Sequence, residues 1–416
     1  MTETAGSTQG SSVARAPRGN NGGRWLTRNV FAIGMLSLFS DAGHELTTAV
    51  LPLFLATFGG GAEALGVIEG FSDAGSSLLK FWMAFYSDRV GRRKPIMVIG
   101  YIVTAMMGFL GFVTAWWQIV AIRMAAWMGR GARGPVRDAL LSESVPPEAH
   151  GRAFGFEGAM DTLGAIIGPA IALSLVGVIA LRHIFLIAFI PGAITVVIVL
   201  FVLQDIPRTP QPALEIIASL RDLPRAFWRY AAAVGVFGFG NFAHTLLVLH
   251  AVTVLTPRFG VATAGRIGIG LYIVHNVIYA AASYPIGALG DRMNKKLLLA
   301  TGYALFGLMC LGFILAGSHV VALAALFAVA GLYIAIVDTM ERALAADVLP
   351  LTRRGTGYGA LATINSFGDL TSSIVVGYLW SHGSATAGFT YAVVLTLTGA
   401  LALLTAPTAS AAVSGS

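Results

Sequence analysis

Long apolar runs separated by short polar stretches fill almost the whole chain. Twelve of these runs are long enough for a helix to cross a hydrocarbon core about 30 Å thick, which takes roughly 20 residues. Runs such as residues 194–202 do not alternate at period two, so helices are predicted rather than the strands of a closed barrel. The predicted spans are residues 30–55, 64–87, 95–116, 118–141, 152–178, 183–203, 228–251, 267–289, 297–317, 319–347, 356–380 and 388–406.

Polar segments divide the twelve runs into two groups of six. Residues 1–28 and 407–416 are polar and are predicted to be tails, the first of them disordered and basic. The longest linker, residues 204–227, contains four prolines and follows the sixth run. We therefore expect an all-α polytopic membrane protein with an N-terminal six-helix bundle over residues 29–203 and a pseudo-symmetric C-terminal bundle over residues 228–406.

Composition supports a membrane class. The 416 residues are 56% hydrophobic and only 11% charged, and the mean hydropathy is +0.76. Soluble domains carry about 25% charged residues. The net charge of +7 comes from short basic clusters between apolar runs, which is typical of membrane loops and argues against nucleic acid as a partner. The single cysteine, Cys310, excludes a disulfide framework, and no zinc-binding spacing or cofactor motif is present.

Loop charge predicts the orientation. Basic residues concentrate in alternate loops, whereas the intervening loops carry little beyond Arg182, Arg258 and Arg266. With the basic first tail on the same side, both termini are predicted to be cytoplasmic in a bacterial inner membrane. The basic residues of the alternate loops are Arg89, Arg92, Arg93, Lys94, Arg152, Arg208, Arg221, Arg225, Arg292, Lys295, Lys296, Arg353 and Arg354.

The two groups of six runs repeat a loop pattern. Residues 86–94 end the second run with an Asp-Arg pair and a basic cluster, and residues 287–296 end the eighth run in the same way. Asp291 lies 203 positions after Asp88, and a second matching pair of segments, beginning at Ala139 and Ala343, is offset by 204. Parallel six-helix repeats with a site at their interface are typical of secondary transporters.

These loops resemble the pattern of the major facilitator superfamily. Asp88, Arg89, Gly91, Arg92 and Arg93 match the first loop, with Ala84 in place of its leading glycine. The resemblance implies the twelve-helix fold of that family, a monomer in the lipid bilayer and a small-molecule or ion substrate. The echo in the second half keeps Gly287, Asp291 and Arg292 and has Asn294 where the family has glycine.

Two further segments carry the resemblance. Gly164, Gly168 and Pro169 in the fifth run are similar to the family's antiporter-associated pattern, although Ile171 and Ala172 replace its trailing glycines. Arg123 resembles the family's buried arginine of helix 4. The resemblance also implies that the repeated loop acts as a conformational latch, with Asp88 near the start of helix 11 and Asp138 paired with Arg92 or Arg89. Simple enforcement of topology is the alternative.

Charged residues inside the predicted spans are the most informative feature, because each costs about 2.5–3.5 kcal/mol near the bilayer centre. Acidic and histidine side chains recur at spacings of three and four on single helix faces, opposite arginines in the fourth run. One interpretation is a salt-bridge network that only holds the first bundle together. The other is a polar cavity for protons and a cationic or zwitterionic substrate, in which Asp41 and Asp73 couple proton movement and Arg123 or Arg130 modulates them. The residues of this set are Asp41, His44, Glu45, Glu69, Asp73, Arg123, Arg130, Glu157 and Asp161.

The second bundle has fewer polar insertions. Asn241, His244 and Asp369 are predicted to line the same cavity, whereas His275 is interpreted as a packing residue. The acid and histidine side chains could suit a borderline divalent ion, but no fixed ligand spacing supports a metal site. Metal binding therefore stays an open alternative.

The sequence contains no phosphate-binding loop and no nucleophile elbow, so an ion gradient is expected to drive transport. The leading hypothesis is a proton-coupled secondary transporter that works by alternating access and exports a cation, either a metal ion or an organic cation, by antiport. The alternative is proton-driven import of a metal chelate such as a siderophore, or of a small anionic or zwitterionic metabolite. A membrane enzyme or receptor would need a soluble element that the tails and linker are too short to hold.

Overall fold

The computed structural model describes residues 25–90, 92–146, 150–206, 220–221, 223–290, 292–349 and 354–405. Within this part every named element is helical, so the predicted all-α fold is confirmed. The elements are α1 (Arg28–Ala56), α2 (Ala62–Val90), α3 (Lys94–Ala105), η1 (Met106–Phe112), α4 (Trp116–Glu143), α5 (His150–Leu175), α6 (Leu181–Ile187), α7 (Phe189–Val197), η3 (Ile198–Val202), α9 (Arg225–Gly238), α10 (His244–Gly290), α11 (Lys295–Ala316), α12 (Val320–Val348), α13 (Arg354–His382) and α14 (Ala385–Thr405).

These elements make the twelve crossings predicted from hydropathy. The third crossing joins α3 to η1, and the sixth joins α6, α7 and η3. Helix α10 holds parts of two crossings, because its backbone turns at Gly260, where φ is 75° and ψ is 161°. Only glycine adopts such a φ readily, so the turn falls at this residue.

The prediction of an unbroken seventh span over residues 228–251 is wrong. Helix α9 ends at Gly238, residues 239–243 are not helical, and a new helix begins at His244. Two serines of α13 bond the freed backbone groups: the Ser372 hydroxyl donates to the carbonyl of Asn241 over 2.6 Å, and the Ala243 amide donates to Ser373 Oγ over 3.1 Å. Non-helical backbone is tolerated at membrane depth only where protein groups bond it in this way.

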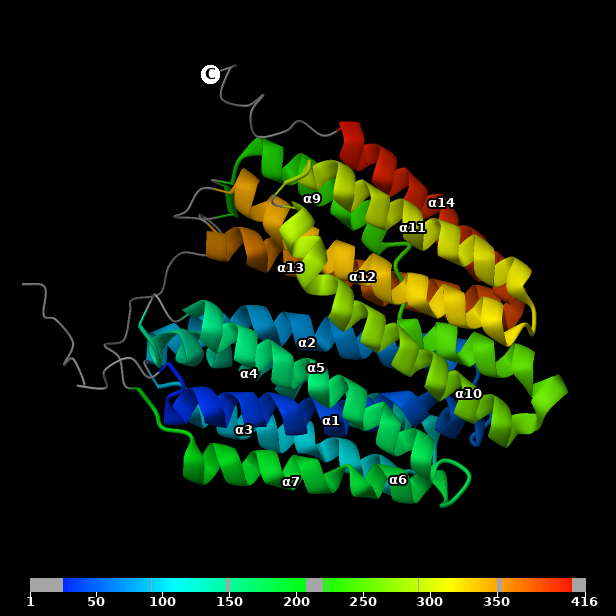
Figure 1. Ribbon diagram of the computed structural model, residues 1–416, viewed down its shortest axis with the longest axis horizontal. Helices are drawn as coiled ribbons and strands as arrows, with labels where there is room; N and C mark the ends of the chain where they lie inside the picture. The colour runs from blue at the N-terminus through cyan, green and yellow to red at the C-terminus, as the bar shows by residue number, and fades with distance from the viewer. Residues whose placement is uncertain are drawn as a thin grey trace, which may run out of the picture.

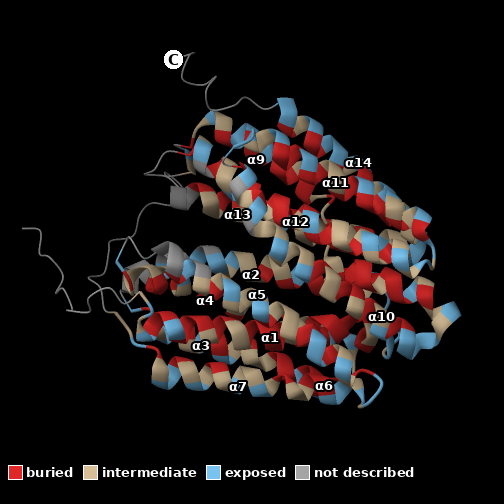
Figure 2. Ribbon diagram, viewed as in Figure 1, coloured by how far each residue is buried: buried red, intermediate tan, exposed pale blue. Residues whose placement is uncertain are grey.

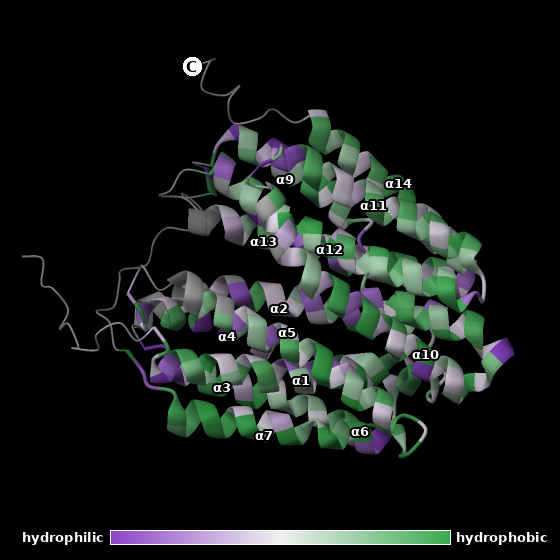
Figure 3. Ribbon diagram, in the orientation of Figure 1, coloured by the Kyte–Doolittle hydropathy of each residue, from purple (hydrophilic) through white to green (hydrophobic). Residues whose placement is uncertain are grey.

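Seven of the described helical stretches are long and apolar enough to cross a membrane by themselves. Helices α1, α2, α4 and α13 are 28 or 29 residues long but carry the polar insertions singled out in the sequence. The outward faces are apolar and exposed, for example at Leu315 and Val321 with exposed fractions of 83% and 84% (Figures 2 and 3). Surfaces of this kind face lipid in a multi-pass membrane protein.

The helices form two bundles, one from α1 to α7 and the other from α9 to α14 (Figure 1). In the first, α1 packs on α5 and α2 packs on α4; in the second, α10 packs on α12 and α11 packs on α14. We call the end where α1 begins at Arg28 the terminal end, and the end where α1 stops at Ala56 the distal end. The predicted tails and most of the predicted linker lie outside the described residues.

Helices α2 and α13 join the two halves through small residues. A Cβ atom on Gly66 would lie 2.1 Å from the carbonyl oxygen of Ser373, and one on Gly377 would lie 2.5 Å from that of Ala62. Nearer the middle of the two helices, the hydroxyls of Ser77 and Ser366 form a hydrogen bond. Helix α10 also contacts α1 and α5. The halves are therefore in contact from the distal end to the middle of the helices.

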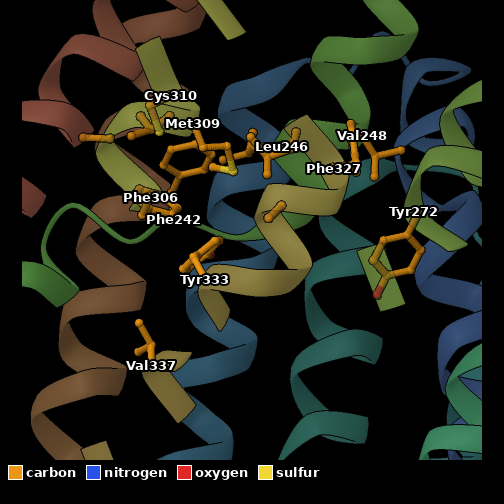
Figure 4. Close-up of a cluster of buried hydrophobic side chains, with 14 of the residues drawn as sticks. Phe242, Leu246, Val248, Tyr272, Phe306, Met309, Cys310, Phe327, Tyr333 and Val337 are labelled. Carbon is orange, nitrogen blue, oxygen red and sulfur yellow. The ribbon is translucent and has the colours of Figure 1, made fainter. Parts of the chain in front are cut away.

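The second half has an aromatic core beside the broken seventh crossing. Phe242, Phe306 and Tyr333 gather around Cys310 (Figure 4), and the ring centroids of Phe306 and Tyr333 are 4.7 Å apart. The thiol of Cys310 is buried in this core, where it packs as a small apolar group.

Candidate functional site

Asp41, His44 and Glu45 share one face of α1, as their spacing predicts. Two glycines of α5 let the two helix backbones touch beside them: a Cβ atom on Gly164 would lie 2.5 Å from the carbonyl oxygen of Leu38, and one on Gly168 would lie 2.5 Å from that of Ala42. The glycines of the fifth span therefore have a packing role beside the acids of α1, because any side chain would separate these helices.

Asp41 lies at the junction of three helices. Its Oδ1 accepts a hydrogen bond of 2.6 Å from Nη1 of Arg130 on α4. The carboxyl group of Asp161 on α5 is close enough to Asp41 for a hydrogen bond between them. Two carboxyl groups beside one guanidinium leave one acid in excess, and two such groups share a proton more readily than they both ionise. We call Asp41, Arg130 and Asp161 the acid triad.

Arg123 and Glu69 form a closed ion pair beside the acid triad. Nη2 of Arg123 donates to both carboxylate oxygens of Glu69, at 2.9 and 2.8 Å, and the guanidinium lies 4.3 Å from the ring centre of Trp127. Only 1% of Arg123 and 3% of Glu69 is exposed. Of the two interpretations of the buried charges, a structural salt bridge describes this pair better than a substrate cavity does.

Asp73 occupies the face of α2 that packs on α13. It lies between Gly70, whose Cβ position is 2.9 Å from the carbonyl oxygen of Leu370, and Ser77, which bonds Ser366. Its Oδ1 accepts a hydrogen bond of 2.7 Å from the indole nitrogen of Trp127. A neutral donor therefore holds this carboxyl group at the junction between the halves.

Asp369 stands on α13 at the same level. Its Oδ1 accepts from Nδ2 of Asn241 over 3.3 Å, and Oδ1 of Asn241 in turn accepts from the hydroxyl of Tyr333 over 3.2 Å. Asp369 lies between Ser366 and Ser373, which both face α2, and its charge interacts with that of Asp73. Each half thus presents one acid with a neutral hydrogen-bond donor at their interface.

Glu45 and His244 meet through a residue that sequence reasoning missed. The hydroxyl of Tyr272 on α10 donates to Oε2 of Glu45 over 2.6 Å and lies 3.0 Å from Nε2 of His244. The rings of His244 and Tyr272 are stacked, with centroids 5.2 Å apart, and His275 stacks on both. A tyrosine in an apolar run carries no signal by itself, although His275 and Asn276 follow within one turn of helix.

Glu157 belongs to a pair nearer the terminal end rather than to the acid triad. Its Oε1 accepts from Nη1 of Arg137 over 2.6 Å and from the hydroxyl of Ser37 over 2.6 Å. Arg137 also bonds Asp138 over 3.1 Å. Arg137 is therefore the described partner of Asp138, whereas the side chain of Arg89 lies outside the described residues.

The loop residues are only partly described. The side chains of Asp88 and Arg89, and all of Gly91 and Asp291, lie outside the described residues, so the predicted latch at the start of α13 stays a prediction. Arg92 and Arg292 are exposed, and Gly287 lies in α10. Arg93 is buried and bonds Glu143 over 2.6 Å, which ties α3 to α4.

The structure gives the metal alternative no support. In the described ranges no three histidine, cysteine, aspartate or glutamate residues are grouped as a metal site. Asp41 is held by Arg130 and Asp73 by Trp127, so two of the acids considered as ligands have other partners. Nε2 of His44 lies 3.6 Å from Oε1 of Glu45, and the His44 ring packs on Trp127 with ring centroids 4.0 Å apart.

Comparison with known proteins gives a consistent family assignment over residues 31–415. The family model described as Major Facilitator Superfamily matches residues 31–274 and 258–415. An uncharacterized MFS-type transporter of Methanocaldococcus jannaschii is 30% identical over 395 residues, which cover 93% of this chain and 97% of that protein. The class B tetracycline resistance protein of Escherichia coli is 27% identical over 179 residues, 42% of this chain and 44% of that protein.

Solved structures agree in fold. A crystal structure of a nucleoside transporter matches with a TM-score of 0.76 and 14% identity, covering 90% of this chain and 99% of that one. A D-xylose–proton symporter matches with a TM-score of 0.72 and 14% identity, covering 93% and 99%. At this identity the likeness shows the shared fold alone.

Proposed function

The chain belongs to the major facilitator superfamily, and from this premise we propose that this multi-pass membrane transporter exports a cationic substrate by proton antiport. The observation that carries the proposal is the pair formed by Asp73 and Asp369, one from each half, whose hydrogen bonds come from the neutral groups of Trp127 and Asn241. A cation between these carboxyl groups would be attracted to both halves at once.

Proton coupling is assigned to the acid triad. Arg130 neutralises one carboxylate, so the second carboxyl group can hold a proton without leaving net charge in the membrane interior. Protonation of Asp41 or Asp161 would release part of Arg130's attraction and weaken the tie between α4 and α1. The close glycine contacts of α5 with α1 support this assignment, because Asp41 of the triad and Glu45 lie one turn apart on α1.

Alternating access follows from the division into halves. With the distal end closed, a substrate cation binds Asp73 and Asp369 from the terminal end; rocking of the halves then exposes it to the distal side. After the cation has left Asp73 and Asp369, return of the empty transporter requires a proton on the acid triad, which gives exchange. The loop charges support cytoplasmic termini in a bacterial inner membrane, and this orientation makes the cycle an export cycle.

The relatives add support for export. The tetracycline resistance protein and a multidrug resistance protein of Proteus mirabilis, 27% identical over 218 residues, are named for resistance. The similarity to these two proteins covers 42% and 50% of this chain, whereas the similarity to the transporter of Methanocaldococcus jannaschii covers 93% of it. We propose that this chain acts as a monomer, with protons as the coupling ion.

The test uses inverted membrane vesicles acidified inside, with a pH-sensitive dye. Nickel, cobalt, ferrous iron and lipophilic organic cations are added singly. One of them is expected to release protons with the unchanged protein, while Asp41→Asn abolishes the release and Asp73→Asn or Asp369→Asn weakens the apparent affinity. The control is Asp347→Asn, because Asp347 bonds Lys295 over 2.9 Å and 45% of its side chain is exposed. Silence across the panel, or full exchange in Asp41→Asn, would overturn the proposal.

One observation favours the alternative of anion or chelate import. The Arg130 side chain is 32% exposed even though Asp41 holds it, so part of the guanidinium is open to a ligand. An anionic substrate would bind there by charge-assisted hydrogen bonds. In that case Arg130→Gln would chiefly weaken substrate binding, whereas in cation export it would chiefly disturb coupling.

A further inference from the structure

A line of residues on α10 bridges the halves at a second place, away from Asp73 and Asp369. Gly265, Tyr272 and Asn276 lie on one face, at spacings of seven and four residues. Gly265 packs on Leu53 of α1, the Tyr272 hydroxyl bonds Glu45 of α1, and Nδ2 of Asn276 donates to the carbonyl oxygen of Ala165 on α5 over 3.2 Å. This face of α10 therefore lies against α1 and α5.

Among these contacts, only the one at Tyr272 involves an ionisable partner. Tyr272 is 2% exposed, and its hydroxyl points away from Val248 in the hydrophobic cluster of Figure 4. Its single proton goes to Glu45 over 2.6 Å, so its oxygen accepts from Nε2 of His244. The His244 and His275 rings stacked on Tyr272 fix the direction of the hydroxyl.

The strength of this bond depends on the charge of Glu45. A hydroxyl donates about twice as strongly to a carboxylate as to a neutral acceptor. The bond joins α1 of the first half to α10 of the second, on the distal side of the acid triad, so it exists only while the distal end is closed. A charged Glu45 therefore favours the closed distal end, and a neutral Glu45 favours it less.

We infer that Tyr272 is a positioning residue that links the charge of Glu45 to closure of the distal end. The inference deepens the proposed function, since it assigns the conformational effect of a proton to one hydrogen bond. Ionisable groups on every element packed here lie near Glu45 or near its neighbours Tyr272 and Asp41. They are Asp41 and His44 on α1, Glu69 on α2, Arg123 and Arg130 on α4, Asp161 on α5, and His244 and His275 on α10.

The test measures the distal distance between the halves by pulsed electron paramagnetic resonance, in nanodiscs without substrate or gradient. Cys310→Ser removes the single native cysteine, and Val178→Cys with Val321→Cys places one exposed spin label at the distal end of each half. Tyr272→Phe keeps the stacked ring and removes only the hydroxyl. We expect the ratio of long to short distances to rise about tenfold, as for loss of a hydrogen bond to a charged group.

A double-mutant comparison separates coupling from general loosening. Glu45→Gln should raise the same ratio. The double variant Glu45→Gln with Tyr272→Phe should have the ratio of Tyr272→Phe alone, within about twofold, because the two changes remove the same interaction. The matched control is Tyr279→Phe on the same helix, whose hydroxyl bonds Asp338 within the second half over 2.8 Å and should leave the distance unchanged.

Two outcomes would overturn the inference: an unchanged ratio in Tyr272→Phe, or a double variant whose ratio is the product of the two single effects. The readout needs no substrate, so it stays valid if the vesicle assay finds no cation exchange. Conversely, cation exchange together with an unchanged distal distance would leave the proposed function standing and remove the role of Tyr272.

Discussion

The two halves share a fold but hold their buried acids in different ways. In the first half, Asp41, Glu69, Glu143 and Glu157 each bond an arginine, at distances of 2.6 to 2.8 Å. In the second half the described side-chain hydrogen bonds to the buried acids Asp338, Glu341 and Asp369 come from neutral groups. Tyr279 bonds Asp338 at 2.8 Å, Tyr303 and Asn365 bond Glu341 at 2.7 and 2.8 Å, and Asn241 bonds Asp369 at 3.3 Å.

This difference teaches that duplication of a fold does not duplicate its electrostatics. An arginine with a single acid fixes that acid as a carboxylate, because a neutral acid would leave a buried cation unpaired. Arg130 has two acids beside it, so it fixes only one of them as a carboxylate. A tyrosine hydroxyl can donate to a carboxylate or accept from a carboxylic acid, so it tolerates both states. The ion-paired acids of the first half therefore carry compensated charges, and Glu45, Asp73 and the second acid of the triad are its exceptions. The described buried acids of the second half all have donors that tolerate both charge states.

The sharpest test of the comparison is Glu69→Gln in the first half. The variant leaves Arg123 buried and charged without its carboxylate, so we expect a loss of about 3–5 kcal/mol in the free energy of unfolding. Unfolding by SDS in mixed micelles measures it. Adding Arg123→Met should recover much of the loss, since no unpaired charge then remains; a loss under about 1 kcal/mol, typical of exposed pairs, would contradict the assignment.

A smaller loss is expected for Arg137→Gln. Glu157 keeps its hydrogen bond from the Ser37 hydroxyl when the guanidinium is removed, so the cost should be about 1–3 kcal/mol in the same titration. Arg137→Gln combined with Ser37→Ala is the control, and it should cost more than the sum of the single changes. Equal costs for Arg137→Gln and Glu69→Gln would show that Ser37 contributes nothing.

Glu341→Gln is the counterpart of Glu69→Gln in the second half. Tyr303 can still donate to the amide oxygen, and Asn365 can turn its own amide to accept from the new N–H groups. We expect a loss of only about 1 kcal/mol on unfolding by SDS, the net worth of one neutral hydrogen bond. If the loss matched that of Glu69→Gln, the two halves would not differ as described.

The smallest effect is expected for Gly287→Ala in the repeated loop pattern. Among the described residues, a Cβ atom there would meet only Thr339, at 3.6 Å, and the first half already has Ala84 at the matching position. Removing a helical glycine should stabilise the protein by up to about 1 kcal/mol. Gly164→Ala is the contrasting control and should destabilise the protein, because its Cβ would collide with the backbone of α1. If Gly287→Ala also destabilised the protein, α10 would have to pack more tightly at this position than it does in the structure.

The sequence predicted the crossings well, because hydropathy depends on each run alone. Charge inside the runs also drew attention to residues that are neighbours in the structure: Asp41, Arg130 and Asp161 meet, from α1, α4 and α5. The sequence left open whether Arg123 or Arg130 accompanies Asp41. That choice depends on the depth and rotation of each helix in the membrane. The apolar runs do not specify either one, because the faces toward lipid and the faces toward protein are both apolar.

Other features had weaker signals. Tyr272 and Trp127 are ordinary residues of apolar runs, and their roles arise only when another helix brings Glu45 or Asp73 to them. The break in the seventh crossing had a local signal, since Gly235, Gly238 and Gly240 precede Asn241 within seven residues. Its existence still depends on Ser372 and Ser373, which lie about 130 positions later.

That distance has a consequence for how the protein is made. When the seventh span leaves the ribosome, the carbonyl of Asn241 and the amide of Ala243 have no serine to bond, because α13 has not yet been synthesised. Orphaned backbone groups are costly in lipid. The nascent seventh span therefore stays a continuous helix or remains beside the insertion machinery, and it takes its final broken form only when the eleventh span enters the membrane.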